Sequence, residues 1–188
     1  MRLLRLGEID APTGSRVGGA PPTGVDRTCP TCGGRAEYVL TLAPDVLGPT
    51  VDDRVLSVLA CADVGCRMLG PAGDRSVLLV VHADAPRSDE PDDGFEGRAL
   101  VADPPTDVDD DPNSDQSKVG GEPGYLQPWG HELGPEMEAA GFGFLAQWSE
   151  VTYGRQMRRG AYPFMFGTVY LFAAGTDLAT ARGFWQNA

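Results

Sequence analysis

The sequence has no run of residues long and apolar enough to cross a membrane, which takes about 20 apolar residues in a helix. The apolar stretch in residues 1–6 is too short to form the core of a secretion signal. We therefore expect a soluble protein that resides in the cytoplasm, does not bind a membrane and keeps its thiols reduced.

A basic patch of the kind that neutralises nucleic-acid phosphates is also missing, so nucleic acid is not expected to be the main partner. The formal net charge is −12, and most of it falls in residues 84–116, which hold twelve acidic and two basic residues. This segment is also rich in proline and poor in apolar residues. Such a composition is typical of a solvated linker, and it divides the chain into a first lobe at 1–83, an acidic linker at 84–116 and a second lobe at 117–188.

Histidine is scarce, which bears on whether the chain is an enzyme. Only His82 and His131 are present, and neither belongs to a recognisable motif of nucleophile and base. The letters of residues 141–146 fit a dinucleotide-binding loop, but the residues before them are not strand-like. We therefore expect a protein without catalytic activity. The alternative is a small hydrolase or transferase with a cleft between the lobes and either histidine as its base.

The 25 glycines and 16 prolines disfavour long helices and favour short strands joined by turns. Runs rich in Val, Leu, Tyr and Phe predict strands. The clearest are 37–42, 54–61, 76–82, 143–148 and 168–174. Residues 95–101 fit one further short strand at a sheet edge, and a short C-terminal helix is expected at 178–184. The predicted fold class is mainly β (α+β).

An internal repeat underlies the division into lobes. Residues 15–21, SRVGGAP, recur as SKVGGEP at 117–123, and strand-like runs follow both copies in the same order. Chance similarity between glycine- and proline-rich turns is the alternative. We favour two related β-rich lobes that arose by duplication.

All four cysteines lie in the first lobe, as a C-x2-C pair, Cys29 and Cys32, and a C-x4-C pair, Cys61 and Cys66. Two such knuckles brought together offer four thiolates to a tetrahedral ion, an arrangement that suits zinc and leaves no position open for a substrate. The pattern predicts one structural zinc ion. An iron–sulfur cluster, two disulfides and unrelated buried cysteines are the alternatives.

Aromatic residues gather in the second lobe, and some fall in turn-rich stretches where side chains are often exposed. Tyr125 and Trp129, together with Arg155, Arg158 and Arg159, have the composition of a protein–protein interface. The interpretation is a surface that binds another protein. Packing within the core is the alternative for the aromatic residues.

Several segments resemble the YwqG and programmed-cell-death-protein-2 superfamily. In the second lobe they are SKVGGEPGYLQ at 117–127, GFLAQW at 143–148, VYLF at 169–172 and FWQ at 184–186. In the first lobe CPTCGG, APDVL and RVLSVLAC are similar to the cysteine-bearing copy of that superfamily.

The resemblance implies a duplicated β-rich fold with no known catalytic activity and a protein partner. Eukaryotic members are similar to chaperones of a basic small-subunit ribosomal protein, and some bacterial members look like immunity proteins of toxin systems. Relatives often carry a second cysteine pair where residues 135–140 have none, so only one zinc ion is expected. The composition, rich in Ala, Asp, Gly and Arg, suggests a bacterial protein.

Overall fold

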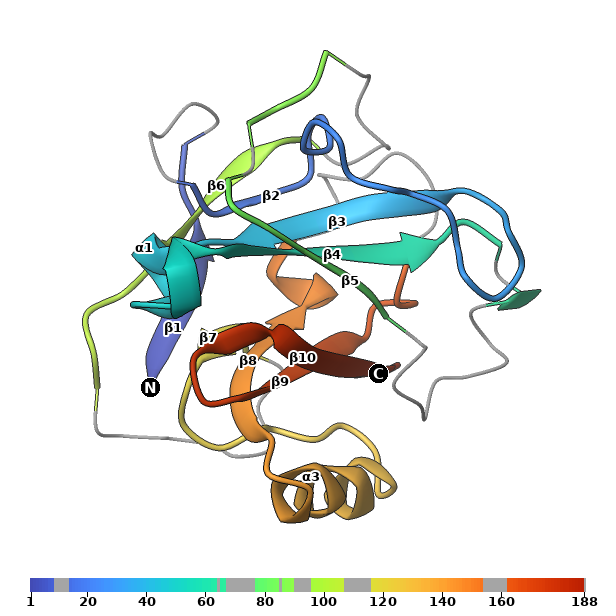
Figure 1. Cartoon of the computed structure of the whole chain (residues 1–188). Coiled ribbons are helices and arrows are strands. Elements are labelled where there is room, and N and C mark those ends of the chain that lie inside the picture. The colour runs from blue at the N-terminus through green and yellow to red at the C-terminus, as the bar shows by residue number, and fades with distance from the viewer. Residues whose placement is uncertain are drawn as a thin grey trace.

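The computed structural model describes residues 1–8, 14–63, 65–66, 77–84, 86–89, 96–106, 116–153 and 162–187. Within these ranges the protein is mainly β (Figure 1). The strands in chain order are Arg2–Leu6 (β1), Arg16–Val17 (β2), Ala36–Leu42 (β3), Val55–Cys61 (β4), Leu78–His82 (β5), Arg98–Ala102 (β6), Lys118–Val119 (β7), Gly143–Ser149 (β8), Thr168–Ala174 (β9) and Asp177–Gln186 (β10).

The described helices are short. They are α1 (Pro44–Leu47), α3 (Gly130–Ala139) and two 3-10 turns, η1 (Val51–Asp53) and η2 (Glu150–Tyr153). No helix within the described ranges has the length and apolar character needed to span a membrane.

All ten strands belong to one antiparallel sheet with the order β10-β9-β8-β7-β1-β6-β2-β3-β4-β5. Along each strand the side chains alternate between the two faces. In β4, for example, Leu56 and Val58 enter a large apolar cluster, whereas Ser57 lies on the opposite face. We call β1–β5 the first half of the chain and β6–β10 the second half. The large cluster contains residues from strands of both halves, so the sheet curves around one shared core.

The centre of the sheet joins the two halves through their first strands. β1 and β6 pair with each other, and each also pairs with the short strand of the opposite half, β1 with β7 and β6 with β2. The backbone amide of Leu4 donates to Ser117 at 2.8 Å, and that of Leu100 donates to Ser15 at 3.0 Å. The two lobes of the sequence interpretation are therefore parts of one continuous sheet.

The two halves match in their turns and bulges. Gly18 and Gly19 follow β2 with φ of 64° and 73°, and Gly120 and Gly121 follow β7 with 66° and 78°, a region that favours glycine. β3 and β8 each have a register shift at the same place in the strand. The hydroxyl of Ser15 accepts the amide of Ala43 at 2.8 Å, and that of Ser117 accepts the amide of Ser149 at 2.9 Å.

The same match extends across the strands, because cross-strand neighbours form one row in each half. The row is Arg16, Thr41, Ser57 and Val80 across β2–β5, and Lys118, Gln147, Tyr170 and Phe184 across β7–β10. Both rows begin with a buried basic residue, and Lys118 is only 1% exposed. These paired positions allow residues of one half to be compared directly with those of the other.

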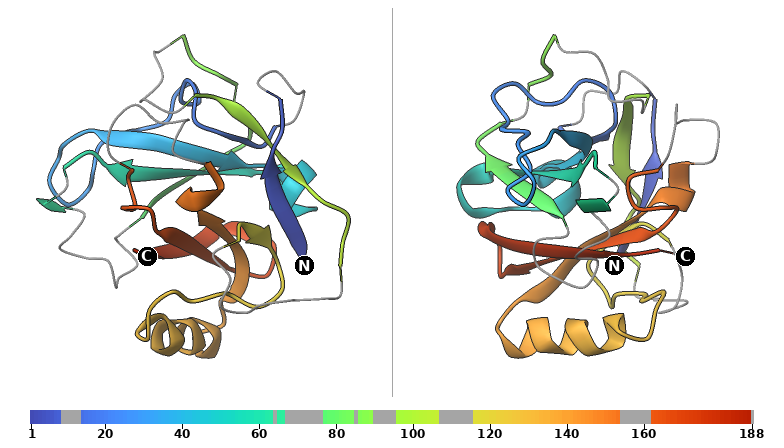
Figure 2. Two further views of the ribbon diagram at one scale, coloured as in Figure 1. Left: turned by 180° about the vertical axis from the view of Figure 1, so that it is seen from behind. Right: turned by 90° about the vertical axis from the view of Figure 1, so that its right-hand side faces the viewer.

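Helix α3 covers the outer face of the second half. It lies on the far side of β8–β10 from β3 and β4 (Figure 2). A second apolar cluster fills the space beneath it, built on Tyr125, Tyr170, Phe172 and Phe184, with Trp129, Leu133, Met137, Phe142 and Phe144 packed against it. Gly130 and Gly134 allow the close approach, since a Cβ on either would collide with Gln186 or the Tyr125 hydroxyl.

The predicted C-terminal helix at 178–184 is wrong, because these residues belong to β10. They pair with β9, and a register shift between Asp177 and Arg182 interrupts the alternation that would have identified a strand. The burial of Leu178, Phe184 and Trp185 on both faces of the sheet explains why β10 is an extended strand.

Residues 95–101 were predicted to form a strand at a sheet edge. A strand is present there, β6, but it does not lie at an edge. β6 lies between β1 and β2 at the centre of the sheet, and Leu100 is fully buried in the shared core. This part of the acidic segment is structure, because β6 completes the hydrogen bonding of both neighbours. Residues 107–115 and 90–95 of the same segment lie outside the described residues.

We predict that Leu100→Ala lowers the free energy of unfolding by about 2–5 kcal/mol, because it leaves a cavity at the centre of the sheet. Urea unfolding followed by circular dichroism measures the loss. Val51→Ala, at a side chain 39% exposed, is the control and should cost less than about 0.5 kcal/mol. Equal losses in the two variants would contradict the central position of β6.

Candidate metal centre

The four cysteines come together at one end of the β3–β4 hairpin. Cys29 and Cys32 lie on the turn that precedes β3, Cys61 is the last residue of β4, and Cys66 follows in the next turn. The register places Ala36, at the start of β3, opposite Cys61. The hairpin itself therefore brings the two pairs together, although 28 residues separate them in the chain.

Local hydrogen bonds shape both turns. The amide of Cys29 donates to the carbonyl of Gly34 at 2.7 Å, and the amide of Gly33 donates to that of Cys29 at 2.8 Å. Gly33 has a φ of 72°, which a residue with a Cβ rarely adopts. In the second turn the amide of Cys66 donates to the Asp63 carboxylate at 2.8 Å.

The sulfur positions suit a tetrahedral metal ion. All four Sγ atoms lie within 4.8 Å of one another, with 3.8 Å between Cys29 and Cys66 and 3.5 Å between Cys32 and Cys61. The thiols are free, and these separations exceed the ~2.05 Å of a disulfide. Four sulfurs at about 2.3 Å from one ion would be about 3.8 Å apart. The group could hold a metal ion, and the prediction of a four-cysteine site is confirmed to that extent.

The thiols differ in exposure and in acidity. Cys29 and Cys61 are buried, Cys66 is partly buried and Cys32 is exposed. Burial opposes ionisation of Cys29, but backbone amides of Cys32 and Thr31 and the Cys61 thiol donate to it and lower its pKa to about 7. Burial raises the pKa of Cys61 to about 11 and also raises that of Cys66. A bound cation would offset the cost of the remaining thiolates, so metal binding would release protons.

A chain of hydrogen bonds crosses the outer face of β3–β5. The Tyr38 hydroxyl lies 2.8 Å from that of Thr41, which lies 2.8 Å from that of Ser57. Nε2 of His82 is 2.8 Å from the Ser57 hydroxyl, and its Nδ1 is 2.5 Å from the carbonyl of Asp84. Ser57 is 0% exposed, so its hydroxyl is not open to a substrate, and the chain serves to satisfy buried polar groups.

The basic side chain of Arg16 influences two members of this chain, Tyr38 and His82. The Arg16 guanidinium lies 5.7 Å from the centre of the Tyr38 ring. Burial raises the pKa of Tyr38, and Arg16 partly opposes the shift. Burial also lowers the pKa of His82, which the hydrogen bond to Asp84 resists and the nearby Arg16 charge reinforces. The neutral imidazole is therefore the favoured form in the folded chain.

Of the five predicted partner-binding residues, the structure describes two, Tyr125 and Trp129. Tyr125 is only 9% exposed and packs in the cluster beneath α3, 5.1 Å from the His131 ring and 5.3 Å from that of Tyr170. Its burial corrects the expectation that it is an exposed anchor. Trp129 is half-buried, and its Nε1 donates to Gln127 at 2.5 Å. The other three predicted residues, Arg155, Arg158 and Arg159, lie outside the described residues.

The turn at 162–167 exposes two apolar side chains that were not among the predicted partner-binding residues. Met165 and Phe166 are each 44% exposed and have left-handed backbones, with φ of 55° and 62°. The buried carboxylate of Glu150 accepts the amides of Phe164 at 3.0 Å and Phe166 at 2.9 Å. The Tyr162 and Phe166 rings are 4.1 Å apart. A positive φ at two successive non-glycine residues has no reliable sequence signal, so the sequence did not single out Met165 and Phe166.

A scan against models of protein families found no match, and a search of curated proteins found none either.

We predict that His82→Gln reduces the loss of stability on acidification. Because the pKa of His82 is lower in the folded than in the unfolded chain, the unfolded chain binds more protons, and stability falls as the pH drops below about 6.5. Melting temperatures between pH 7.5 and 5 should therefore fall less in His82→Gln than in the wild type. His131→Gln keeps His82 and should retain the wild-type fall; identical curves for all three proteins would refute the assignment.

Proposed function

We propose that the chain is a non-enzymatic protein-binding module stabilised by one structural zinc ion. The zinc would fix the turn before β3 to the end of β4, and the turn at 162–167 would contribute to the partner surface. The observation that carries the binding proposal is the turn at 162–167. Met165 and Phe166 are exposed there in an unfavourable backbone conformation. The buried Glu150 carboxylate stabilises the turn by accepting two of its amides.

Zinc is favoured for the metal centre by the donor set and by the sulfur separations. Four thiolates suit a borderline-soft ion that has no preferred geometry of its own. With all four bound, no coordination position remains for a substrate or water, so the ion would act on stability rather than in a reaction. A reducing cytoplasm, which we propose as the location, would keep the thiols available.

The energetic cost of the apolar turn supports partner binding. Each non-glycine residue in a left-handed backbone costs on the order of 1–3 kcal/mol, and exposing Met165 and Phe166 forgoes the gain from burial. Glu150 offsets part of this cost with two hydrogen bonds from a fully buried position. A partner that covers both side chains would recover the apolar burial without paying to order the turn.

The charge of the chain favours a basic partner. A net charge of −12 attracts a basic protein at long range and accelerates its encounter. A chaperone for a ribosomal-protein-like client and an immunity protein that neutralises a toxin would both use this property. These are the two roles implied by the family that the sequence resembles.

We also propose that the two halves arose by duplication of one β-rich unit. The matching rows, glycine turns and serine hydrogen bonds support this origin. In each half the first strand is paired with the opposite half, as in a strand-exchanged dimer joined into one chain.

The purified protein should contain about one zinc ion per chain by elemental analysis. Cys32→Ser should lower the free energy of unfolding by about 2 kcal/mol or more, because the energy of metal binding is also folding energy. Thr31→Ser, a similar change in the same turn that removes no ligand, is the control. Absence of metal, with four freely reactive thiols in the folded chain, would overturn the zinc proposal.

Phe166→Ala should raise the dissociation rate of the native partner by about tenfold, equal to about 1.4 kcal/mol, through loss of a central apolar contact. Its melting temperature should not fall. Val151→Ala, at a side chain 50% exposed, is the matched control and should leave the rate unchanged. The partner is isolated from native lysate, and rates are measured by surface binding. An unchanged rate in Phe166→Ala would contradict the proposed role of the turn.

A further inference from the structure

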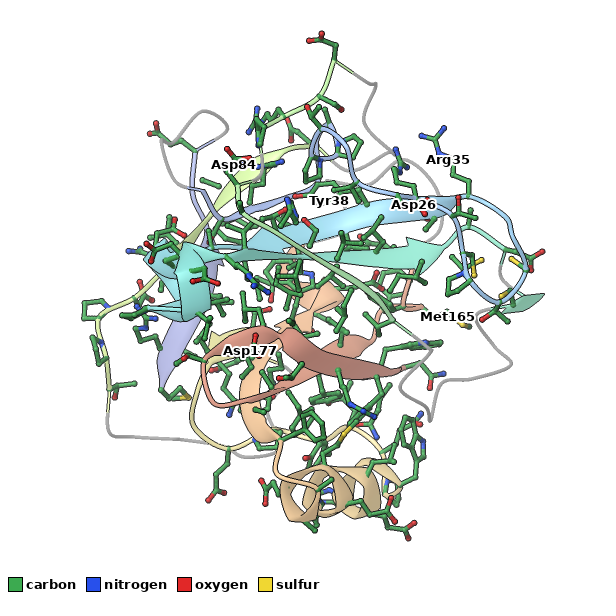
Figure 3. All side chains as sticks on the ribbon, viewed as in Figure 1. Asp26, Arg35, Tyr38, Asp84, Met165 and Asp177 are labelled. Carbon is green, nitrogen blue, oxygen red and sulfur yellow. The ribbon has the colours of Figure 1, made fainter. Side chains whose placement is uncertain are left out.

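A groove runs between the cysteine turn and the edge strand β5. Asp26, Thr28 and Pro30 form one wall, residues 77–80 form the other, and the volume is about 330 Å³. Figure 3 shows Asp26 on the same side of the molecule as Arg35, which directly precedes β3. The groove is therefore bounded by the cysteine turn on one side and by β5 on the other.

β5 lacks the features that usually protect an edge strand. Its sequence, LLVVH, contains no charged residue and no proline, and all five residues are partly exposed. Within the described residues it forms strand hydrogen bonds with β4 alone, while β10 lies close enough that a Cβ on Gly183 would touch Val77. The opposite edge, β10, carries Asp177, Arg182 and a register shift. Natural edge strands avoid exposed apolar side chains because these promote association, so the apolar edge of β5 indicates a binding surface.

Comparison of the two halves shows what the groove lacks. Val80 stands opposite Ser57, and its counterpart Phe184 stands opposite Tyr170. Phe184 is fully buried, with the ring of Trp129 5.6 Å away beneath α3. Val80 has no such cover from the described residues and stays partly exposed. An apolar group from outside the chain would bury Val80 on β5, as the segment around α3 buries Phe184 on β10.

One carboxylate, that of Asp26, lies on the rim of the groove. The amide of Thr28 donates to the carboxylate of Asp26 at 2.9 Å, and this hydrogen bond together with one from the Thr28 side chain lowers the pKa of Asp26. Asp26 is therefore ionised near neutral pH. Apolar residues lie deeper in the groove, where Leu78 and Val80 are only partly exposed. The arrangement is complementary to an apolar side chain with a neighbouring Lys or Arg.

We propose that this groove binds an extended segment of a partner protein that places a bulky apolar side chain on Leu78 and Val80 and a Lys or Arg beside Asp26. The inference rests on the proposed protein-binding function and adds the chemistry of the segment that is recognised. The apolar side chains of β5 would supply affinity for the segment, and the Asp26 carboxylate would supply specificity.

Two blocked peptides test the proposal, Gly-Leu-Lys-Leu-Lys-Gly and the same sequence with Glu for Lys. Titration followed by the methyl NMR signals of Leu78 and Val80 should show saturable shifts with the Lys peptide only. Leu78→Asp should weaken binding at least about tenfold, and Asp26→Asn should weaken it severalfold and reduce its salt dependence. Val51→Asp, which adds a charge at an exposed apolar site elsewhere, should have no effect.

Equal binding of the Glu peptide, or shifts away from β5 that Leu78→Asp leaves unchanged, would overturn the proposal. Leu78→Ser repeats the test with a milder change, and thermal melting verifies that each variant is folded. Dimerisation that Leu78→Asp abolishes in sedimentation would also overturn it, with a second copy as the occupant. If the groove binds no peptide but a native partner remains sensitive to Phe166→Ala, only this inference fails; if both tests fail, the binding function fails as well.

Discussion

The pairing of β1 with β6 is the constraint on which the rest of the fold depends. Each of these strands opens one half of the chain yet pairs with the short second strand of the other half. Neither half can complete its hydrogen bonding alone, and the large apolar cluster forms only when both are present. The position of the cysteine hairpin and that of α3 are set relative to one another through this central ladder.

The two halves share one arrangement of strands, but different segments pack on the outer face of the sheet in each half. In the second half α3 and its aromatic cluster cover the outer face, and the amide groups of Gln147 and Gln186 hydrogen-bond the loop before the helix. In the first half the cysteine turn lies near the corresponding face, and hydroxyl groups and His82 take the equivalent polar positions. The cysteine turn therefore takes, in one half, part of the place that a helix takes in the other.

The residue types alone predicted the β-rich fold and the cysteine group, because strand runs and knuckle spacings are local signals. They did not predict where β6 lies or that 178–184 is a strand, since both depend on pairing with distant residues. Helix α3 was also missed, because Gly134 and Pro135 disfavour a helix, and only the close contact with Tyr125 explains the glycine. Tyr125 was expected at the surface because the sequence does not show which loop a helix will cover.

The burial of Lys118 has a chemical consequence. This is the chain's single lysine, and its side chain is 1% exposed at the start of the row that crosses β7–β10. Acylating reagents, amine-directed cross-linkers and enzymes that modify lysine would find no side-chain amine open to solvent in the folded chain. Reaction at this position requires β7 to separate from its neighbours, so any acylated Lys118 would record a transient opening at the middle of the sheet.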